Sequence, residues 1–197
     1  GPEVSLFLLC DGKSVYPMPL AQDYKRRFEH NRGPNTGGMG SFSPVQWAQP
    51  YEAKIQQEII TPLETALQKL PEPFCGLLFV GILIHQENNQ KGSPYILEFN
   101  VRFGDPETQS VLPRLNSDFY ELLYHTATGD LKQYVTNNPV TWSDTYSVCV
   151  NLVHNEYPQK SGKGEVITIG ELREAVKVFH AGTELNQNSL VTNGGRI

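Results

Sequence analysis

One stretch of sequence decides the fold of this chain: Ile96-Leu97-Glu98-Phe99-Asn100-Val101-Arg102-Phe103-Gly104-Asp105-Pro106-Glu107. Across residues 95–103 apolar and polar side chains alternate, which predicts a half-buried β-strand. Ile96, Glu98, Asn100 and Arg102 fall on one face of that strand, with alternate side chains about 7 Å apart. We therefore expect a carboxylate, an amide oxygen and a guanidinium in one row on an open face.

That row of side chains suits phosphate chemistry. Glu98 and Asn100 offer hard oxygen ligands to Mg²⁺, which keeps several waters and binds through one or two carboxylates plus substrate phosphates. Arg102 is suited to clamp a phosphoryl or acyl-phosphate oxygen. Asp105 and Glu107 flank Pro106, a favourable first residue of a helix, and add negative charge at the end of the strand. An exposed edge strand with solvated charges explains the same alternation equally well, so both interpretations stay open.

Composition excludes several classes of protein. The 197 residues allow one large domain or two small ones, and the net charge of −5 argues against nucleic acid as the main partner. No apolar run approaches the roughly 20 residues needed to span a bilayer, and no stretch resembles a signal peptide, so no membrane partner is expected. Cys10, Cys75 and Cys149 lie far apart without metal-site spacing. They indicate buried thiols in a soluble, cytoplasmic protein.

Periodicity and turn residues predict most of the remaining elements. The expected strands before residue 130 are residues 4–10 and 14–18, joined by a turn at Asp11-Gly12, and residues 76–85, which a polar connection at 87–93 joins to the deciding strand. The expected helices are residues 50–70, kinked or divided by Pro62, 106–115 and 117–128. Ser117 or Asp118 would cap the last helix and Gly129 would end it.

A glycine-rich stretch follows the charged run at residues 21–27 and reads Gly33-Pro34-Asn35-Thr36-Gly37-Gly38-Met39-Gly40. Glycines permit positive φ and let consecutive backbone N–H groups turn inward around an anion. The spacing matches neither the P-loop nor the dinucleotide-binding pattern. A plain flexible loop after a solvated charged run is the open alternative.

The character of the chain changes after Asp130. Residues 131–144 are polar, and short strands are predicted at residues 146–154, 165–169, 176–180 and 190–192. We therefore expect one domain over residues 1–130 and a small, mainly β domain over residues 131–197 that is truncated.

Four strings resemble the phosphoribosylamine–glycine ligase family of the ATP-grasp superfamily. They are Pro19-Leu20-Ala21-Gln22-Asp23-Tyr24-Lys25-Arg26, the stretch at residues 33–40, residues 97–109 and Val191-Thr192-Asn193-Gly194-Gly195-Arg196. Their order and spacing match that family along nearly the whole chain. The resemblance implies an α+β fold, in which the large ATP-grasp subdomain, an antiparallel sheet with helices, is followed by a small, mainly β C-terminal domain.

The resemblance also implies a reaction. Glycine would be joined to 5-phosphoribosylamine through a glycyl phosphate, with ATP as co-substrate and Mg²⁺ or Mn²⁺ as cofactor, in purine nucleotide synthesis. The resemblance reaches only the later part of that enzyme. The amino-terminal domain and the smaller ATP-grasp subdomain, with its nucleotide-covering lysines, would be missing partners from the same polypeptide, so this chain alone is expected to be inactive.

Site residues follow from the same resemblance. It implies metal ligands at Glu98 and Asn100, an active-site arginine at Arg102 and a ribose-contacting glutamate at Glu3. The substrate-facing set is Asp23, Lys25, Asn35, Thr36, Gly37, Gly38, Met39, Asp105 and Glu107. The sequence departs from the family where Tyr24 replaces a common His. It departs from many ATP-grasp relatives where residues 81–84 are apolar instead of supplying another acidic ligand.

Two functions of other classes stay open. One is a non-catalytic structural or partner-binding module. The other is a metal-dependent hydrolase built on Glu98, Asp105 and Glu107, although the sequence shows no His-rich ligand set or nucleophile–base pair for it.

Overall fold

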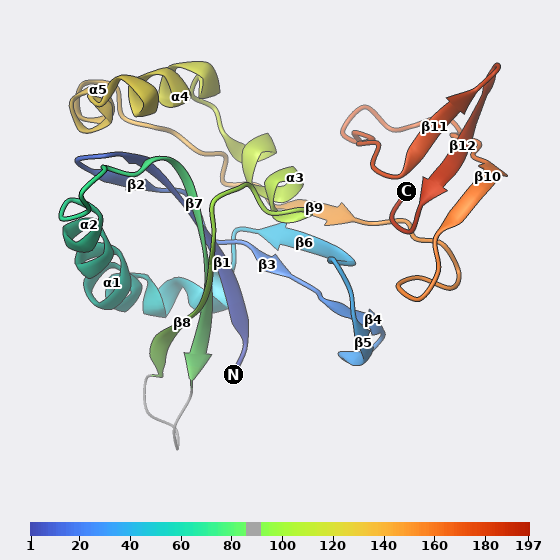
Figure 1. The fold of residues 1–197 in the computed structure, drawn as a ribbon, viewed down its shortest axis with the longest axis horizontal. Coiled ribbons are helices and arrows are strands. Elements are labelled where there is room, and N and C mark those ends of the chain that lie inside the picture. Colours follow the sequence, from blue (N-terminus) through green and yellow to red (C-terminus); the bar gives the residue numbers. More distant parts are fainter. Residues whose placement is uncertain (86–91) are drawn as a thin grey trace. The chain divides into compact units, whose positions relative to one another are not determined.

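A computed structural model describes residues 1–85 and 92–197 of the chain (Figure 1). These residues divide into two compact units, the first of residues 1–23 and 41–149 and the second of residues 24–40 and 150–197. Most of the polar connection expected at residues 87–93 lies outside the described residues. Among the described residues, no helix combines the length and the apolar character needed to cross a bilayer.

The first unit mixes helices with strands, and the regular elements described in the second unit are strands. Strands of the first unit are β1 (Glu3–Asp11), β2 (Val15–Pro17), β3 (Gln22–Asp23), β6 (Gly40–Ser43), β7 (Cys75–His85), β8 (Ser93–Asn100) and β9 (Ser147–Val150). Its helical segments are η1 (Gln46–Tyr51), α1 (Glu52–Ile55), η2 (Gln56–Ile60), α2 (Thr61–Leu67), α3 (Glu107–Val111), η3 (Leu112–Arg114), α4 (Phe119–Thr128) and α5 (Leu131–Asn137). The second unit has β4 (Arg26–Phe28), β5 (Arg32–Asn35), β10 (Gly162–Val166), β11 (Thr183–Asn186) and β12 (Ser189–Gly194). This mixture confirms the predicted α+β class.

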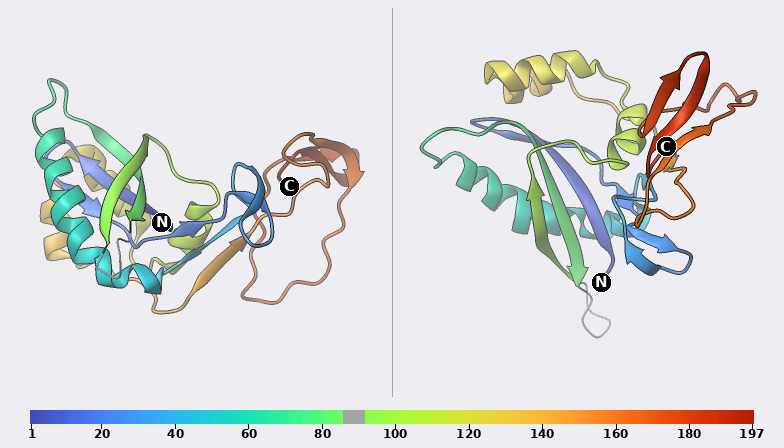
Figure 2. Two further views of the ribbon diagram at one scale, coloured as in Figure 1. Left: turned by 90° about the horizontal axis from the view of Figure 1, so that it is seen from below. Right: turned by 45° about the vertical axis from the view of Figure 1, so that its right-hand side comes forward.

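A four-stranded antiparallel sheet in the order β2-β1-β7-β8 forms the centre of the first unit. Figures 1 and 2 show α1 and α2 on one side of this sheet and α4 and α5 on the other. Every residue of β1 after Glu3 is buried. A strand covered on both faces requires such a continuous apolar run, and Leu6 and Leu8 pack toward one core while Phe7 and Leu9 pack toward the other.

Two predicted features that depend on local sequence are confirmed. The β1–β2 hairpin turns at Gly12, whose φ of +83° favours glycine. The helical region expected at residues 50–70 is divided close to Pro62. Proline has no N–H to donate to the preceding turn, and a π-helical turn, η2, lies immediately before α2.

The predicted caps of α4 are also confirmed. Asp118 accepts hydrogen bonds from the N–H groups of Tyr120 at 2.8 Å and Glu121 at 3.3 Å. Gly129 ends the helix with φ of +79°. The compact units differ from the predicted division at residue 130, because Leu131 is fully buried in the first unit and its N–H donates to Asp11 Oδ2 at 3.0 Å.

Of the strands predicted after residue 144, three are present with shifted bounds, as β9, β10 and β12. The strand predicted at residues 176–180 is wrong, since that segment pairs with no strand in the described part of the chain. Its place in the sheet is taken by β11, which forms a hairpin with β12. The turn between them contains Gln187 with φ of +53°, a conformation that the sequence does not signal.

Arg114 is a buried cation that ties together three segments of the first unit. Its guanidinium donates to Ser43 Oγ at 2.8 Å, the Ser143 carbonyl at 2.8 Å and the Thr145 carbonyl at 3.0 Å. Replacing it with Met leaves buried acceptors without a donor, so we expect Arg114→Met to lower the free energy of unfolding by about 2 to 4 kcal/mol. Urea denaturation measures this loss. Exposed Arg173→Met is the control, and equal stability of the two variants would contradict the expectation.

The three cysteines are free thiols, and the prediction that they are buried holds only for Cys10, since Cys75 is exposed and Cys149 is half-buried. Burial, aided by the neighbouring Asp11, raises the pKa of the Cys10 thiol to about 12. Since the thiolate is the reactive form, we expect iodoacetamide at pH 8 to modify exposed Cys75 and to leave Cys10 unmodified until the chain unfolds. Peptide mass spectrometry reads both sites, and rapid labelling of Cys10 in the native chain would contradict this environment.

Candidate functional site

The register of β8 places Glu98 and Asn100 on the same face of the sheet. Glu98 lies directly opposite Gly81, and Asn100 lies opposite Phe79, two residues along β7. Directly opposed residues share a face, so the expected placement of the carboxylate and the amide on one face is confirmed. The predicted place of Ile96 is wrong. A bulge at this point pairs Ile96 with Ile82, on the face opposite to Glu98.

The same face continues across three strands. Gly81 is opposite Ser5 on β1 as well as Glu98 on β8, and Glu3 lies two residues before Ser5. Glu3, Glu98 and Asn100, three residues singled out in the sequence, therefore share one face of the central sheet. A Cβ atom at Gly81 would stand 3.1 Å from Glu98 Cγ, so this glycine leaves room for the Glu98 side chain. An isolated glycine in an apolar strand is the sequence signal for such a close approach.

The apolar side chains in and just after β8 do not form the single half-buried face that was predicted, because the bulge puts Tyr95 opposite Leu83, on the face of Glu98, and leaves Phe99 on the other face. Tyr95, Leu97, Phe99 and Val101 keep 47–73% of their surface exposed. The reason is that β8 is the edge strand of the sheet, whereas the helices cover β1 and β7. Phe103 is the exception and packs edge-on against Phe7, with 5.4 Å between ring centroids.

Arg102 lies beyond the last paired residue of β8. The strand ends at Asn100, so the ladder does not fix the face on which Arg102 lies. Its side chain is exposed, and Nη1 donates to the carbonyl of Phe103 at 2.9 Å. Its place beside Glu98 and Asn100 stays a prediction.

Asp105 and Glu107 have different surroundings although they are two residues apart. Asp105 is exposed and accepts a hydrogen bond from Gln109 Nε2 at 2.9 Å. Glu107 is only 4% exposed and accepts from Ser5 Oγ at 3.1 Å. Its Oε2 occupies the space that a Cβ atom of Gly104 would need. Glu107 therefore supports the turn after β8 from inside, and the hydrolase interpretation loses one of its three exposed carboxylates.

Asp23 is connected to this turn through the strand beside it. In the short β3–β6 ladder Asp23 lies opposite Ser41, and Ser41 Oγ donates to the carbonyl of Pro106 at 2.8 Å. The same hydroxyl is 2.8 Å from Ser110 Oγ on α3. The first unit thus holds Asp23 and the turn of Asp105 in one hydrogen-bonded framework.

The second unit contains Lys25 and the glycine-rich stretch. Half of that stretch is not a loop, because β5 pairs with β4 and leaves residues 36–39 as the connection to β6. All four N–H groups of this loop donate within the protein, so they do not form the backbone anion cradle that the glycines suggested. The acceptors are the Lys25 carbonyl for Thr36, Tyr157 Oη for Gly37, Thr36 Oγ1 for Gly38 and the Tyr24 carbonyl for Met39.

The first unit offers a divalent metal a pair of oxygen ligands. Within the described residues no group of three or more His, Cys, Asp or Glu side chains could hold a metal ion. The carboxylate of Glu98 and the amide oxygen of Asn100 form a two-ligand set, which suits Mg²⁺ because that ion retains waters and binds substrate phosphates.

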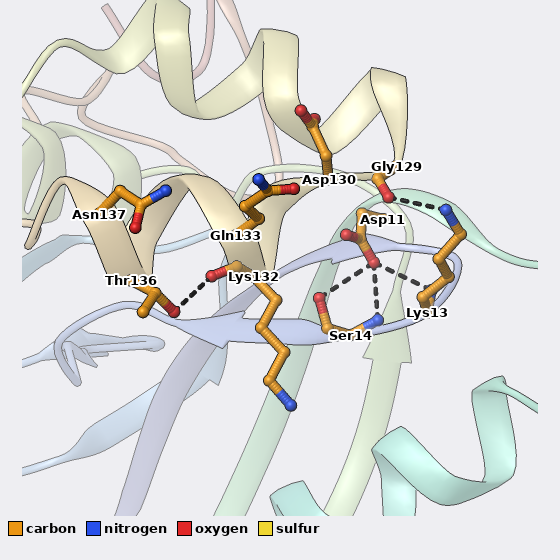
Figure 3. A pocket seen from close by; sticks show the side chains of 9 residues that line it. All are labelled: Asp11, Lys13, Ser14, Gly129, Asp130, Lys132, Gln133, Thr136 and Asn137. Carbon is orange, nitrogen blue, oxygen red and sulfur yellow. Dashed lines mark hydrogen bonds between the residues drawn. The ribbon is translucent and has the colours of Figure 1, made fainter.

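A cavity of about 510 Å³ opens elsewhere in the first unit, beside the β1–β2 turn and α5 (Figure 3). Both of its acidic residues are engaged, since Asp11 Oδ1 accepts from the N–H groups of Lys13 and Ser14 and Asp130 Oδ1 accepts from Thr128 Oγ1. Lys13 Nζ donates to the carbonyl of Gly129 at 2.9 Å. None of the predicted site residues lines this cavity.

The sequence matches known families over most of its length. A family model described as the ATP-grasp (A) domain of phosphoribosylglycinamide synthetase matches residues 1–108. The chain belongs to this family. A second model, the C domain of the same synthetase, matches residues 147–197. The A-domain match includes Glu3, Glu98 and Asn100, and the C-domain match includes the motif at residues 191–196.

The names of similar proteins point to the same family. Phosphoribosylamine–glycine ligase of Corynebacterium ammoniagenes is 39% identical over 198 residues, and that of Rhizobium meliloti is 42% identical over 200 residues. Each match covers 100% of this chain and 45% of the relative, so the chain spans less than half the length of these proteins.

Solved structures give the same result for the fold. The crystal structure of phosphoribosylamine–glycine ligase from Thermotoga maritima matches with a TM-score of 0.83 and 34% identity, over 100% of this chain and 46% of that one. Urea carboxylase of Kluyveromyces lactis matches 98% of this chain and 16% of its own with a TM-score of 0.63. At 16% identity the second match concerns the fold alone.

Proposed function

We propose that a full-length protein containing this chain joins glycine to 5-phosphoribosylamine, with conversion of ATP to ADP and phosphate, giving glycinamide ribonucleotide for purine synthesis. The observation that carries the proposal is the shared sheet face of Glu3, Glu98 and Asn100 in a chain of this family. Such a face offers a carboxylate and an amide oxygen, the kinds of ligand that a divalent metal bound to nucleotide phosphates takes.

The proposed reaction has two steps and uses only ATP, glycine and 5-phosphoribosylamine. The glycine carboxylate attacks the γ-phosphorus of ATP, forming glycyl phosphate as ADP leaves. The amine of 5-phosphoribosylamine then attacks the acyl carbon, and phosphate departs as the amide forms and the amine nitrogen releases one proton. Phosphoryl transfer of this kind depends on positioning and on electrostatic stabilisation more than on covalent catalysis by the protein.

Each side chain has a proposed role in those steps. Glu98 and Asn100 hold Mg²⁺ or Mn²⁺, which would neutralise charge on the transferring phosphoryl group. Arg102 contacts that group, and Glu3 contacts the ribose of the nucleotide. The residues proposed to face the acceptor substrates are Asp23 and Asp105 in the first unit and Lys25, Asn35, Thr36, Gly37, Gly38 and Met39 in the second. Glu107 belongs to the same set through the turn that it supports.

A further part of the proposal concerns the location of the protein in the cell. We propose the cytoplasm as the location, and the three free cysteines support it because disulfides are rare there.

We also propose that the remainder of the relatives' length supplies the lobe that closes over ATP. The chain covers 45% of the Corynebacterium ammoniagenes ligase, which leaves room for such a lobe.

Omission of substrates from an ADP assay tests the function. The full-length protein is incubated with Mg-ATP, glycine and 5-phosphoribosylamine, and then with each acceptor left out in turn. The proposal predicts ADP release that requires glycine, with glycinamide ribonucleotide detected by mass spectrometry. ADP release without glycine would favour the hydrolase, and no ADP with all substrates present would favour the non-catalytic module.

A further inference from the structure

The two glycine motifs of the second unit meet at the side chain of Tyr157. A Cβ atom at Gly37 would stand 3.1 Å from Tyr157 Oη. A Cβ atom at Gly195 would stand 2.9 Å from Tyr157 Cε2 and still nearer to Cδ2, closer than such contacts allow. Both glycines therefore leave space for one tyrosine, which explains why the stretches at residues 33–40 and 191–196 need glycine at these positions.

Gly37 is held through both of its backbone polar groups. Its N–H donates to Tyr157 Oη at 2.9 Å, and its carbonyl accepts from Arg196 Nη1 at 2.8 Å. Asn151 continues the contact along the loop, because Nδ2 donates to the Gly38 carbonyl at 2.8 Å and the backbone N–H donates to the Met39 carbonyl at 3.0 Å. Residues more than 110 positions away thus hold three consecutive loop residues, Gly37 and Gly38 through side chains and Met39 through the backbone of Asn151.

Tyr157 is itself anchored at its backbone. Its carbonyl accepts from Arg27 Nε on β4 at 2.8 Å, and its N–H donates to the carbonyl of His154 at 2.9 Å. The N–H of His154 in turn donates to the carbonyl of Gly195 at 2.8 Å. The phenol that supports Gly37 therefore stands on a turn whose backbone is held by hydrogen bonds to residues outside the loop.

We propose that Tyr157 and Arg196 are positioning residues for the ligation, which set the conformation of residues 36–39 and so of the acceptor-binding surface. This inference rests on the proposed function, since it assigns the loop to the acceptor side. The loop also holds the backbone of Lys25, because the N–H and Oγ1 of Thr36 both donate to the Lys25 carbonyl. Neither Tyr157 nor Arg196 is required to touch a substrate.

The test uses Tyr157→Phe, Arg196→Met and Arg196→Lys in the full-length protein. Tyr157→Phe keeps the ring against Gly195 and removes only the acceptor of the Gly37 N–H, so the fold is expected to survive. Arg196→Lys keeps one donor for the Gly37 carbonyl. The matched controls are Tyr120→Phe and Arg173→Met, at exposed side chains elsewhere.

The first readout is hydrogen exchange of the loop, followed by mass spectrometry without substrates. We expect exchange at residues 36–39 to rise about 5- to 10-fold in Tyr157→Phe and Arg196→Met, the factor that one lost hydrogen bond gives. Arg196→Lys should fall between those variants and the wild type. Exchange equal to the wild type in both Tyr157→Phe and Arg196→Met would overturn the inference.

The second readout separates KM from kcat. The KM for glycine or for 5-phosphoribosylamine should rise about 5- to 10-fold, whereas the KM for ATP should not change, because Glu3, Glu98 and Asn100 belong to the first unit. Faster exchange with unchanged KM values would overturn the positioning role. If the wild type itself shows no glycine-dependent ADP release, the proposed function fails, while the exchange experiment still decides whether these two side chains hold the loop.

Discussion

Glu98→Gln in the full-length protein is expected to lower the turnover number for glycine-dependent ADP formation by about 10²-fold or more. The variant keeps the size and hydrogen-bonding shape of the side chain but loses the charge that a divalent metal needs. Glu98 is exposed at the edge of the sheet, so the substitution should leave the fold unchanged. Phosphoryl transfer relies on charge neutralisation, which makes this loss appear in kcat before it appears in stability.

The control for this variant is Glu52→Gln, an exposed carboxylate at the start of α1. Both variants should match the wild type in circular dichroism and in melting temperature, and only Glu98→Gln should lose turnover. Activity of Glu98→Gln close to the wild type at saturating Mg²⁺ would show that the metal is held elsewhere.

The isolated chain of 197 residues is expected to fold but to release no ADP in the presence of all substrates. The fold should persist because α1, η2 and α2 bury Ile55, Ile59 and Ile60 against the sheet. The chain covers 45% of the Corynebacterium ammoniagenes ligase, and in ATP-grasp chemistry a second lobe covers the nucleotide. Because the isolated chain has only part of the groups that position the phosphates, we expect weak divalent-metal affinity, little ATP affinity and no turnover.

Calorimetric titration with Mg-ATP and a glycine-dependent ADP assay test the two parts of this expectation. Titration with Mn²⁺ alone provides the comparison, because the Glu98–Asn100 face is expected to retain weak affinity for a divalent ion. Micromolar ATP binding, or steady ADP release by residues 1–197, would contradict the view that these residues form only part of an active site.

Features that depend on neighbouring residues could be predicted from the sequence. The Gly12 turn, the division near Pro62 and the caps at Asp118 and Gly129 each follow from the backbone chemistry of one or two residues. The pairing of Glu98 with Asn100 on one face also follows, because side chains two residues apart on a strand share a face.

Features that depend on distant partners could not be predicted in the same way. The bulge that separates Ile96 from Glu98 exists only in the ladder with β7, and alternation along one strand contains no trace of it. The burial of Glu107 depends on Ser5, 102 residues earlier. Neither interpretation of the glycine-rich stretch, an anion cradle or a flexible loop, included the hydrogen bonds of its N–H groups, one of which joins Gly37 to Tyr157, 120 residues later.

The central claim is that Glu98 and Asn100 hold the divalent metal at the nucleotide phosphates. Anomalous diffraction from crystals of the full-length protein grown with Mn²⁺ and ADP tests this claim most directly. We predict a manganese peak within ligand distance, about 2.2 Å, of both a Glu98 carboxylate oxygen and Asn100 Oδ1. A manganese peak that contacts ADP but neither of these side chains would contradict it.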